Sequence, residues 1–316
     1  MSSEHLVDPQ ILPALAMFPD LDLNLERLLA LREGMAAMIP PIESHEGQGV
    51  SVEAIRIPAS GDAPELDVIL HRPDGAVGRL PLFLHIHGGG YVLGTARQNV
   101  PGNMRTAREL GCLVASVEYR LAPEANGTTA VEDCHRALLW LVEQADALDI
   151  DASRIAIGGE SAGGGLTAAL ALFNRDRGGP KLCFQMLIYP MIDDRTGAGD
   201  DLHPYCGQFV WTAQANQFGW RCLLGDVDPA SHTSGHIIPA RAASLEGLPP
   251  AFISTGALDL FLEENLDYAR RLIRAGVPVE LHVYPGAFHG FELAAEAEVS
   301  VRAEAERRAA LRRSFT

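Results

Sequence analysis

Short apolar runs alternate with amphipathic stretches along most of the chain. Six runs have the length and composition of buried strands: Leu82–Ile86, Leu113–Val117, Arg154–Ile157, Phe184–Ile188, Ala251–Ser254 and Val279–Tyr284. Apolar residues at helical spacing predict helices between and after them, over 99–110, 130–145, 162–174, 262–275 and 290–312. Because strands alternate with helices, the pattern predicts βαβ units and a mostly parallel sheet with helices on both faces.

Two further strands are predicted before this region, over Val52–Ile57 and Leu66–Leu70. The second alternates apolar residues with the polar Asp67, and the turn signal Pro73-Asp74-Gly75 follows it. With the six later runs they give an α/β fold whose sheet has about eight strands.

Two segments have no place in this sheet. Residues 22–39 carry apolar side chains at helical spacing, namely Leu25, Leu28, Leu29, Met35 and Ile39, and two prolines end the helix. Residues 195–248 are long for one connection, since most run ~4–6 residues. This insertion holds the aromatic residues Tyr205, Phe209, Trp211, Phe218 and Trp220. We interpret both segments as a helical cap over the sheet.

The cap divides the chain into four parts. They are N-terminal cap helices (1–45), a first part of the core (46–194), a cap insertion (195–248) and a second part of the core (249–316).

Composition narrows the class of protein. Of the 316 residues 47% are hydrophobic, which allows a sizeable core, and the net charge of −16 disfavours nucleic acid and anionic membranes as partners. The N-terminus lacks the features of a signal peptide, and no apolar run is long enough to span a bilayer. Five widely spaced cysteines suit reduced thiols, so we expect a cytoplasmic protein.

The segment Gly159-Glu160-Ser161-Ala162-Gly163 fits the pattern G-x-S-x-G. It follows a predicted strand and precedes a predicted helix, which is the context in which this motif presents a nucleophilic serine. The flanking glycines leave room for the tight turn, and Ser161 then stands exposed at the start of the helix. Ser161 is therefore the candidate nucleophile.

A run of glycines ends the strand Leu82–Ile86, in the segment His87-Gly88-Gly89-Gly90. Glycines let backbone N–H groups approach a ligand, and such donors can stabilise the oxyanion that forms during acyl transfer. We expect the donors to be Gly89, Gly90 and Ala162. A phosphate loop does not fit these glycines, because Gly-Lys-Ser/Thr is absent. A dinucleotide fingerprint starting from Gly158 fails, because its third position is Glu160. His85 and His87 lack a third metal ligand nearby, so we expect them to organise the loop rather than bind a metal.

A serine nucleophile needs a base and an orienting carboxylate, which follow it in the order Ser, Asp, His in this type of sheet. Asp259 and His289 both lie just after predicted strands, one helix and one strand apart. Because the ends of neighbouring parallel strands meet at one sheet edge, we predict that the two side chains meet there. His282 lies within a strand and is the weaker candidate, and His232 and His236 could line a pocket in the insertion.

Five motifs, taken together, resemble the hormone-sensitive-lipase family of bacterial esterases. They are HGGGYVLG (87–94), EYRLAPE (118–124), GESAGG (159–164), LDLF (258–261) and YPGAFHGF (284–291). They occur in the family's order and spacing over roughly residues 50 to 295.

The resemblance implies an α/β-hydrolase fold with a helical cap and a triad of Ser161, Asp259 and His289. It implies an oxyanion hole from Gly88, Gly89, Gly90 and Ala162. Short to medium acyl esters are then the expected substrates, with no cofactor or metal, and a homodimer is possible. We add six residues as candidate substrate contacts: Tyr91, Glu160, Tyr205, Phe209, Trp211 and Phe288.

Two other functions remain open at this stage. An amidase or arylformamidase could use the same triad, because triad chemistry also attacks amides. A non-catalytic binding protein on this fold is the second alternative. It is disfavoured because all three triad candidates are present.

Overall fold

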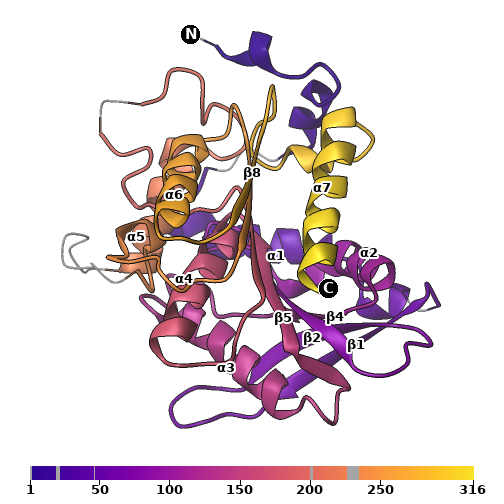
Figure 1. The fold of residues 1–316 in the computed structure, drawn as a ribbon. Helices are drawn as coiled ribbons and strands as arrows, with labels where there is room; N and C mark the ends of the chain where they lie inside the picture. Colours follow the sequence, from indigo (N-terminus) through magenta and orange to yellow (C-terminus); the bar gives the residue numbers. More distant parts are fainter. Residues whose placement is uncertain (1, 19–21, 46, 200–201, 226–234) are drawn as a thin grey trace.

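The computed structural model describes residues 2–18, 22–45, 47–199, 202–225 and 235–316 (Figure 1). Eight strands form one sheet: β1 (Val50–Ile57), β2 (Leu66–Pro73), β3 (Leu80–Ile86), β4 (Leu113–Val117), β5 (Ile150–Glu160), β6 (Phe184–Ile188), β7 (Ala251–Gly256) and β8 (Val279–Tyr284). Each contains one of the predicted apolar runs.

The strand order in the sheet is β1-β2-β4-β3-β5-β6-β7-β8. Strand β2 is antiparallel to both of its neighbours, and all strands from β4 to β8 in this order are parallel. The predicted mostly parallel, eight-stranded α/β sheet is thus confirmed. Because β3, β5, β7 and β8 run in one direction, the loops that follow them gather at one edge of the sheet.

Helices cover both faces of the sheet, as Figure 1 shows. One face carries α3 (Thr129–Glu143), α4 (Ala162–Asp176) and α6 (Leu262–Arg274), and the other carries α2 (Val100–Leu110) and α7 (Glu298–Ser314). Each face has its own hydrophobic cluster, which accounts for the continuous apolar character of the central strands.

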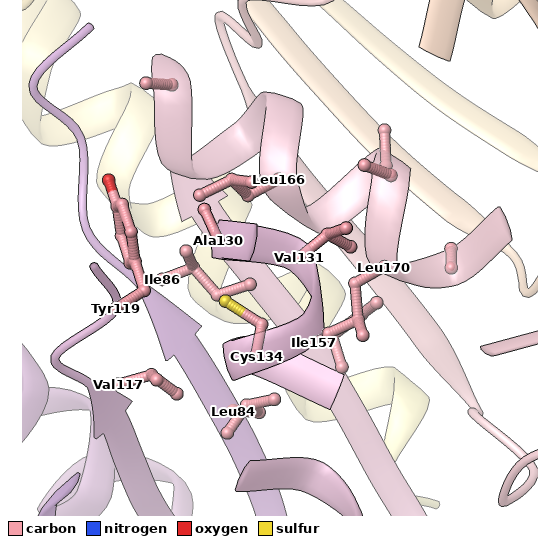
Figure 2. Packing of buried hydrophobic residues seen from close by; sticks show 14 of the residues in the cluster. Leu84, Ile86, Val117, Tyr119, Ala130, Val131, Cys134, Ile157, Leu166 and Leu170 are labelled. Carbon is pink, nitrogen blue, oxygen red and sulfur yellow. The ribbon is translucent and has the colours of Figure 1, made fainter. Parts of the chain in front are cut away.

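Figure 2 shows the packing of the first of these clusters. Side chains of the strands, such as Leu84 and Ile157, meet those of α3 and α4, such as Val131 and Leu170. These four side chains are at most 1% exposed. Burying a residue of this size contributes ~1.5–3 kcal/mol, so this layer rigidly supports the start of α4.

Two helices come from the segments predicted as a cap. The first, α1 (Leu25–Ala37), begins where the Asn24 side chain accepts a hydrogen bond from the Arg27 N–H at 3.0 Å. The second, α5 (Ala213–Leu224), begins in the same way at Thr212, inside the 195–248 insertion. Short 3₁₀ turns complete the fold: η1 (Glu4–Leu6), η2 (Leu12–Met17), η3 (Ile42–His45), η4 (Ala96–Asn99), η6 (Pro239–Arg241) and η7 (Phe291–Leu293).

The apolar face of α1 differs from the prediction. Leu28 is buried and Met35 partly so, but Leu25 and Leu29 are 63% and 61% exposed. Helical spacing alone did not reveal this, because only one stripe of α1 lies against the core.

The helix predicted over 290–312 also differs. The structure has η7 first and begins α7 only at Glu298, because Gly290 adopts a left-handed conformation with φ of 74°. This interruption leaves residues 285–290 as a loop at the edge of the sheet. Among the described residues, no helix has the length and apolar character needed to cross a membrane.

Candidate active site

Ser161 stands at a sharp turn between β5 and α4. Its backbone has φ of 56° and ψ of −120°, a conformation that a residue with a side chain rarely adopts. Three hydrogen bonds hold it there: the Ser161 N–H donates to Ile188, and the Ser161 carbonyl accepts from Gly165 and Met191, at 2.9 to 3.0 Å. Strain of this kind costs about 1–3 kcal/mol and persists only where the surroundings enforce it.

The two glycines of the motif are required by close packing. A Cβ atom on Gly159 would lie 2.2 Å from the carbonyl oxygen of Ile86, and one on Gly163 would lie 2.0 Å from the same oxygen. No side chain fits at such distances. The turn can therefore form against the end of β3 only with glycine at both positions.

A chain of hydrogen bonds connects Ser161, His289 and Asp259. Ser161 Oγ lies 3.0 Å from His289 Nε2, and His289 Nδ1 lies 2.8 Å from Asp259 Oδ2. The other carboxylate oxygen, Asp259 Oδ1, accepts the Phe261 N–H at 2.9 Å. Asp259 is fully buried, and Ser161 and His289 are each 7% exposed. This arrangement can take a proton from the serine and stabilise the resulting imidazolium.

Three aromatic rings surround the His289 ring. Tyr189 and Phe261 contact it edge-on, with ring centroids at 4.6 and 5.3 Å, and Trp211 lies at 6.4 Å. Tyr189 and Phe261 were not among the sequence candidates. Their positions in the sequence could have indicated them, because Tyr189 directly follows β6 and Phe261 lies two residues after Asp259.

The loop after β3 packs against the serine turn. A Cβ on Gly88 would lie 3.4 Å from Ser161 Cβ. Among the described residues, no group accepts a hydrogen bond from the N–H of Gly89, Gly90 or Ala162. N–H donors without a protein acceptor can bind a ligand, and Ala162 directly follows Ser161.

His87 contacts the backbone of this loop. Its Nδ1 is 2.9 Å from the Gly88 carbonyl oxygen, and its ring stacks on Tyr119 with centroids 4.2 Å apart. Burial lowers the pKa of His87 to about 4, so the imidazole is neutral at pH 7. In the described part of the chain, no group of three or more His, Cys, Asp or Glu side chains could hold a metal ion.

Glu160 does not join the three side chains, although we predicted it as a substrate contact. Its carboxylate is 3.0 Å from His85 Nε2, and His85 Nδ1 is 3.0 Å from Ser116 Oγ. Glu160 instead lines a small cavity of about 90 Å³ beside α7 that includes none of Ser161, Asp259 and His289. Burial opposes its charge, but His85 and Arg307 outweigh this and hold the pKa of Glu160 below its usual value. Successive residues of a strand point to opposite faces of the sheet, which explains why the Glu160 side chain points away from the three side chains.

The other predicted substrate contacts divide into two groups. Trp211 and Phe288 lie beside His289, and Phe209 joins them through Phe288, with ring centroids 6.1 Å apart. Tyr91 adjoins Gly90, but its buried hydroxyl donates to the Met191 carbonyl at 2.5 Å. Tyr205 packs near His203 and shows no contact with the triad side chains.

Two other features of the insertion lie apart from this chemistry. His236 pairs with Asp176 at 2.8 Å, which places it at the end of α4, and His232 is outside the described residues. A cavity of about 700 Å³ lies between residues 193–198 and 202–208 and the start of α6. Leu260 lines it, but Ser161, Asp259 and His289 do not.

Comparisons with known proteins identify the family and the fold. A family model described as alpha/beta hydrolase fold matches residues 83–293. The carboxylic ester hydrolase LipN of Mycobacterium tuberculosis is 34% identical over 271 residues, which are 84% of this chain and 70% of LipN. The ethyl acetate hydrolase of Pseudomonas putida is 35% identical over 236 residues, which are 73% of this chain and 72% of that protein.

Among solved structures, a bacterial heroin esterase superposes with a TM-score of 0.91. It is 39% identical, and the alignment covers 100% of both chains. An esterase named LipW from Mycobacterium marinum gives a TM-score of 0.86 at 33% identity, with 99% of this chain and 97% of that chain covered.

Proposed function

The chain belongs to the alpha/beta hydrolase fold family and is a carboxylic ester hydrolase, and we propose that it cleaves short to medium acyl esters through an acyl-enzyme on Ser161. The observation that carries the proposal is the hydrogen-bond chain from Ser161 through His289 to the buried Asp259.

The first half of the reaction forms the acyl-enzyme. Ser161 Oγ attacks the ester carbonyl carbon while its proton passes to His289 Nε2, and Asp259 stabilises the imidazolium through Nδ1–H. The carbonyl oxygen becomes an oxyanion. When this intermediate collapses, His289 returns the proton to the alcohol oxygen, the ester C–O bond breaks and the alcohol leaves.

The second half releases the acid. Water attacks the acyl carbon and gives its proton to His289, a second oxyanion forms, and its collapse breaks the bond to Ser161 Oγ as the proton returns to it. In both halves we assign the oxyanion to the N–H groups of Gly89, Gly90 and Ala162, next to Gly88. Such a donor contributes about 3–4 kcal/mol to the transition state.

The proposed acyl range rests on the aromatic side chains near His289. Trp211 lies against Gly90, so closely that a Cβ there would be 2.1 Å from its ring. Phe288 precedes His289 in the chain and contacts the Phe209 ring. We propose that Trp211 and Phe209 from the cap insertion, with Phe288 from the loop after β8, bound the acyl pocket. The name of one relative, an ethyl acetate hydrolase, supports a short acyl group.

Labelling and mutation of Ser161 test the mechanism. A fluorophosphonate should react with Ser161 and abolish hydrolysis of p-nitrophenyl butyrate, with mass spectrometry locating the adduct. Ser161→Ala should lower kcat by roughly 10³-fold or more, the remainder coming from the oxyanion donors and binding.

Buried Ser116 provides the matched control, because its hydroxyl contacts His85 and not His289. Ser116→Ala should keep most of the activity. Full activity in Ser161→Ala, or an adduct at another residue, would refute the mechanism. A matched anilide that is cleaved faster than the ester would instead favour an amidase.

A further inference from the structure

The backbone of the loop after β3 is held in a tight turn. The Gly89 carbonyl accepts hydrogen bonds from Val92 at 3.1 Å and from Leu93 at 2.8 Å. Tyr91, at the tip, has φ of 66° and is buried. The direction of the Gly89 and Gly90 N–H groups depends on this turn, which a residue with a side chain would not adopt unaided.

A side chain from the N-terminal helix α1 reaches this turn. Arg32 Nε donates to the carbonyl oxygen of Val92 at 2.7 Å, and Arg32 Nη2 donates to that of Ala122 at 2.6 Å. Ala122 is itself joined to the turn, because its N–H donates to the Tyr91 carbonyl at 3.0 Å. The Arg32 guanidinium thus links α1 to two loops that are distant from it in the sequence.

Glu124 fixes the orientation of the guanidinium. Its carboxylate accepts from Arg32 Nη1 at 2.9 Å and from Nη2 at 3.1 Å, a two-point contact with defined geometry. The hydrogen bond from Arg32 lowers the pKa of Glu124, so the carboxylate stays charged at neutral pH. The Arg32 side chain is only 19% exposed, although the carboxylate is 57% exposed.

We propose that Arg32 is a positioning residue that holds the turn 89–93, and with it the oxyanion donors, in the reactive geometry. This inference rests on the proposed function, since it assigns a task to those donors. It also gives the N-terminal helix a role in supporting the oxyanion loop from outside the sheet.

A rigid turn matters most when charge develops on the substrate oxygen. Donors that are slightly misplaced still allow the neutral ester to bind, but they stabilise the oxyanion less. Loss of Arg32 should therefore lower kcat and leave KM nearly unchanged. Since removal of one donor costs about 10²–10³-fold, a loosened turn should cost roughly 10–100-fold.

Arg32→Met tests this, because methionine keeps much of the side-chain stem and removes every donor. Arg27→Met is the matched control on the same helix, since Arg27 is exposed and, in the described part of the chain, its side chain pairs locally with Asp22. In Arg32→Met we expect kcat for p-nitrophenyl butyrate to fall by roughly 10–100-fold, with KM within about threefold. Arg27→Met should match the unaltered enzyme.

A second readout separates positioning from stability. A trifluoromethyl ketone adds to the serine and places an oxyanion where the intermediate has one. Its affinity for Arg32→Met should fall by the same factor as kcat/KM. If Arg32→Met only unfolds at lower temperature, with kcat and ketone affinity intact, Arg32 is a structural clamp and the inference is wrong.

Glu124→Gln covers the case in which Arg32→Met does not fold. The exposed amide keeps one acceptor but loses the charge, so the same pattern should appear more weakly. Unchanged kcat and ketone affinity in Glu124→Gln would then count against the inference. An active Ser161→Ala variant would refute the proposed function itself, whereas an inactive one beside a fully active Arg32→Met refutes only the role of Arg32.

Discussion

His289 owes its place to groups from several parts of the chain. Asp259 is fully buried, and a buried carboxylate is costly unless hydrogen bonds compensate it. It receives one from the Phe261 N–H and one from His289. Because the rings of Tyr189 and Phe261 also confine the imidazole, its two nitrogens are aligned between Asp259 and Ser161 before any substrate binds.

If His289 is the base, its loss should not add to the loss of Ser161. His289→Ala should reduce kcat by about 10²–10⁴-fold, and the double variant with Ser161→Ala should be little worse than either single variant. Initial rates on p-nitrophenyl butyrate measure the single and the double variants.

His282 on β8 is the matched control for this prediction. It pairs with Glu280 at 2.9 Å and with Glu306 at 3.3 Å, in a cluster that includes no triad residue. His282→Ala should keep nearly full activity. If His289→Ala instead retained more than about a tenth of the rate, another group would have to act as the base.

At the scale of elements, the insertion touches the chemistry directly. Trp211 contacts Gly90, and a Cβ on Gly219 of α5 would lie 2.6 Å from the Gly90 carbonyl oxygen. Trp211 is oriented by a 3.3 Å hydrogen bond from its Nε1 to Asn216. The element that we propose to bound the acyl pocket therefore also abuts the oxyanion loop.

Trp211→Ala should consequently change substrate length. In the unaltered enzyme, each methylene added to the acyl group should stabilise the transition state by up to ~0.8 kcal/mol, so kcat/KM should rise. It should fall once the acyl chain meets the cap, near hexanoyl to octanoyl. Removing the indole should shift this optimum to longer chains. A series of p-nitrophenyl esters from acetyl to palmitoyl measures the profile.

Trp140 supplies the control for size and chemistry. It lies on α3, partly buried against the core and away from the serine turn. Trp140→Ala should lower stability but keep the chain-length optimum. An unchanged optimum in Trp211→Ala, or a native preference for palmitoyl esters, would remove Trp211 from the acyl pocket.

At the scale of the whole molecule, buried histidines make the fold sensitive to acid. Burial lowers the pKa of His71 and of His87 from the ordinary 6.5 to about 4. Both are 0% exposed, so the folded state keeps them neutral where the unfolded chain is already protonated. Their contribution to stability is complete above about pH 6.5 and is lost as the pH falls through about 4.

The free energy of unfolding should therefore fall between pH 7 and pH 5, by roughly 2 kcal/mol for each of these histidines. Urea denaturation at the two pH values measures the difference. In His71→Leu the decrease should be smaller by about one histidine's share, since leucine does not titrate. An equal decrease in both proteins would show that His71 does not contribute.

Much of the fold followed from local patterns. Hydrophobic periodicity and length are local properties of the six later strands and the helices between them, and tertiary packing does not override them. The order of these elements along the chain was therefore predictable. The serine turn was predictable for a related reason, because only glycine fits at 159 and 163 beside the end of β3. Asp259 and His289 were found because parallel strands bring their loops to one edge.

Other features depend on which face of an element meets the rest of the molecule. Glu160, a predicted substrate contact, turns to His85 and α7. Leu25 and Leu29 of α1 face solvent, although their helical spacing suggested contact with the core. Arg32 had no local signal at all, because its partners Val92, Ala122 and Glu124 are 60 to 92 residues away. Periodicity defines an element and its faces, but the choice among those faces, and every contact between distant loops, is made by packing in three dimensions.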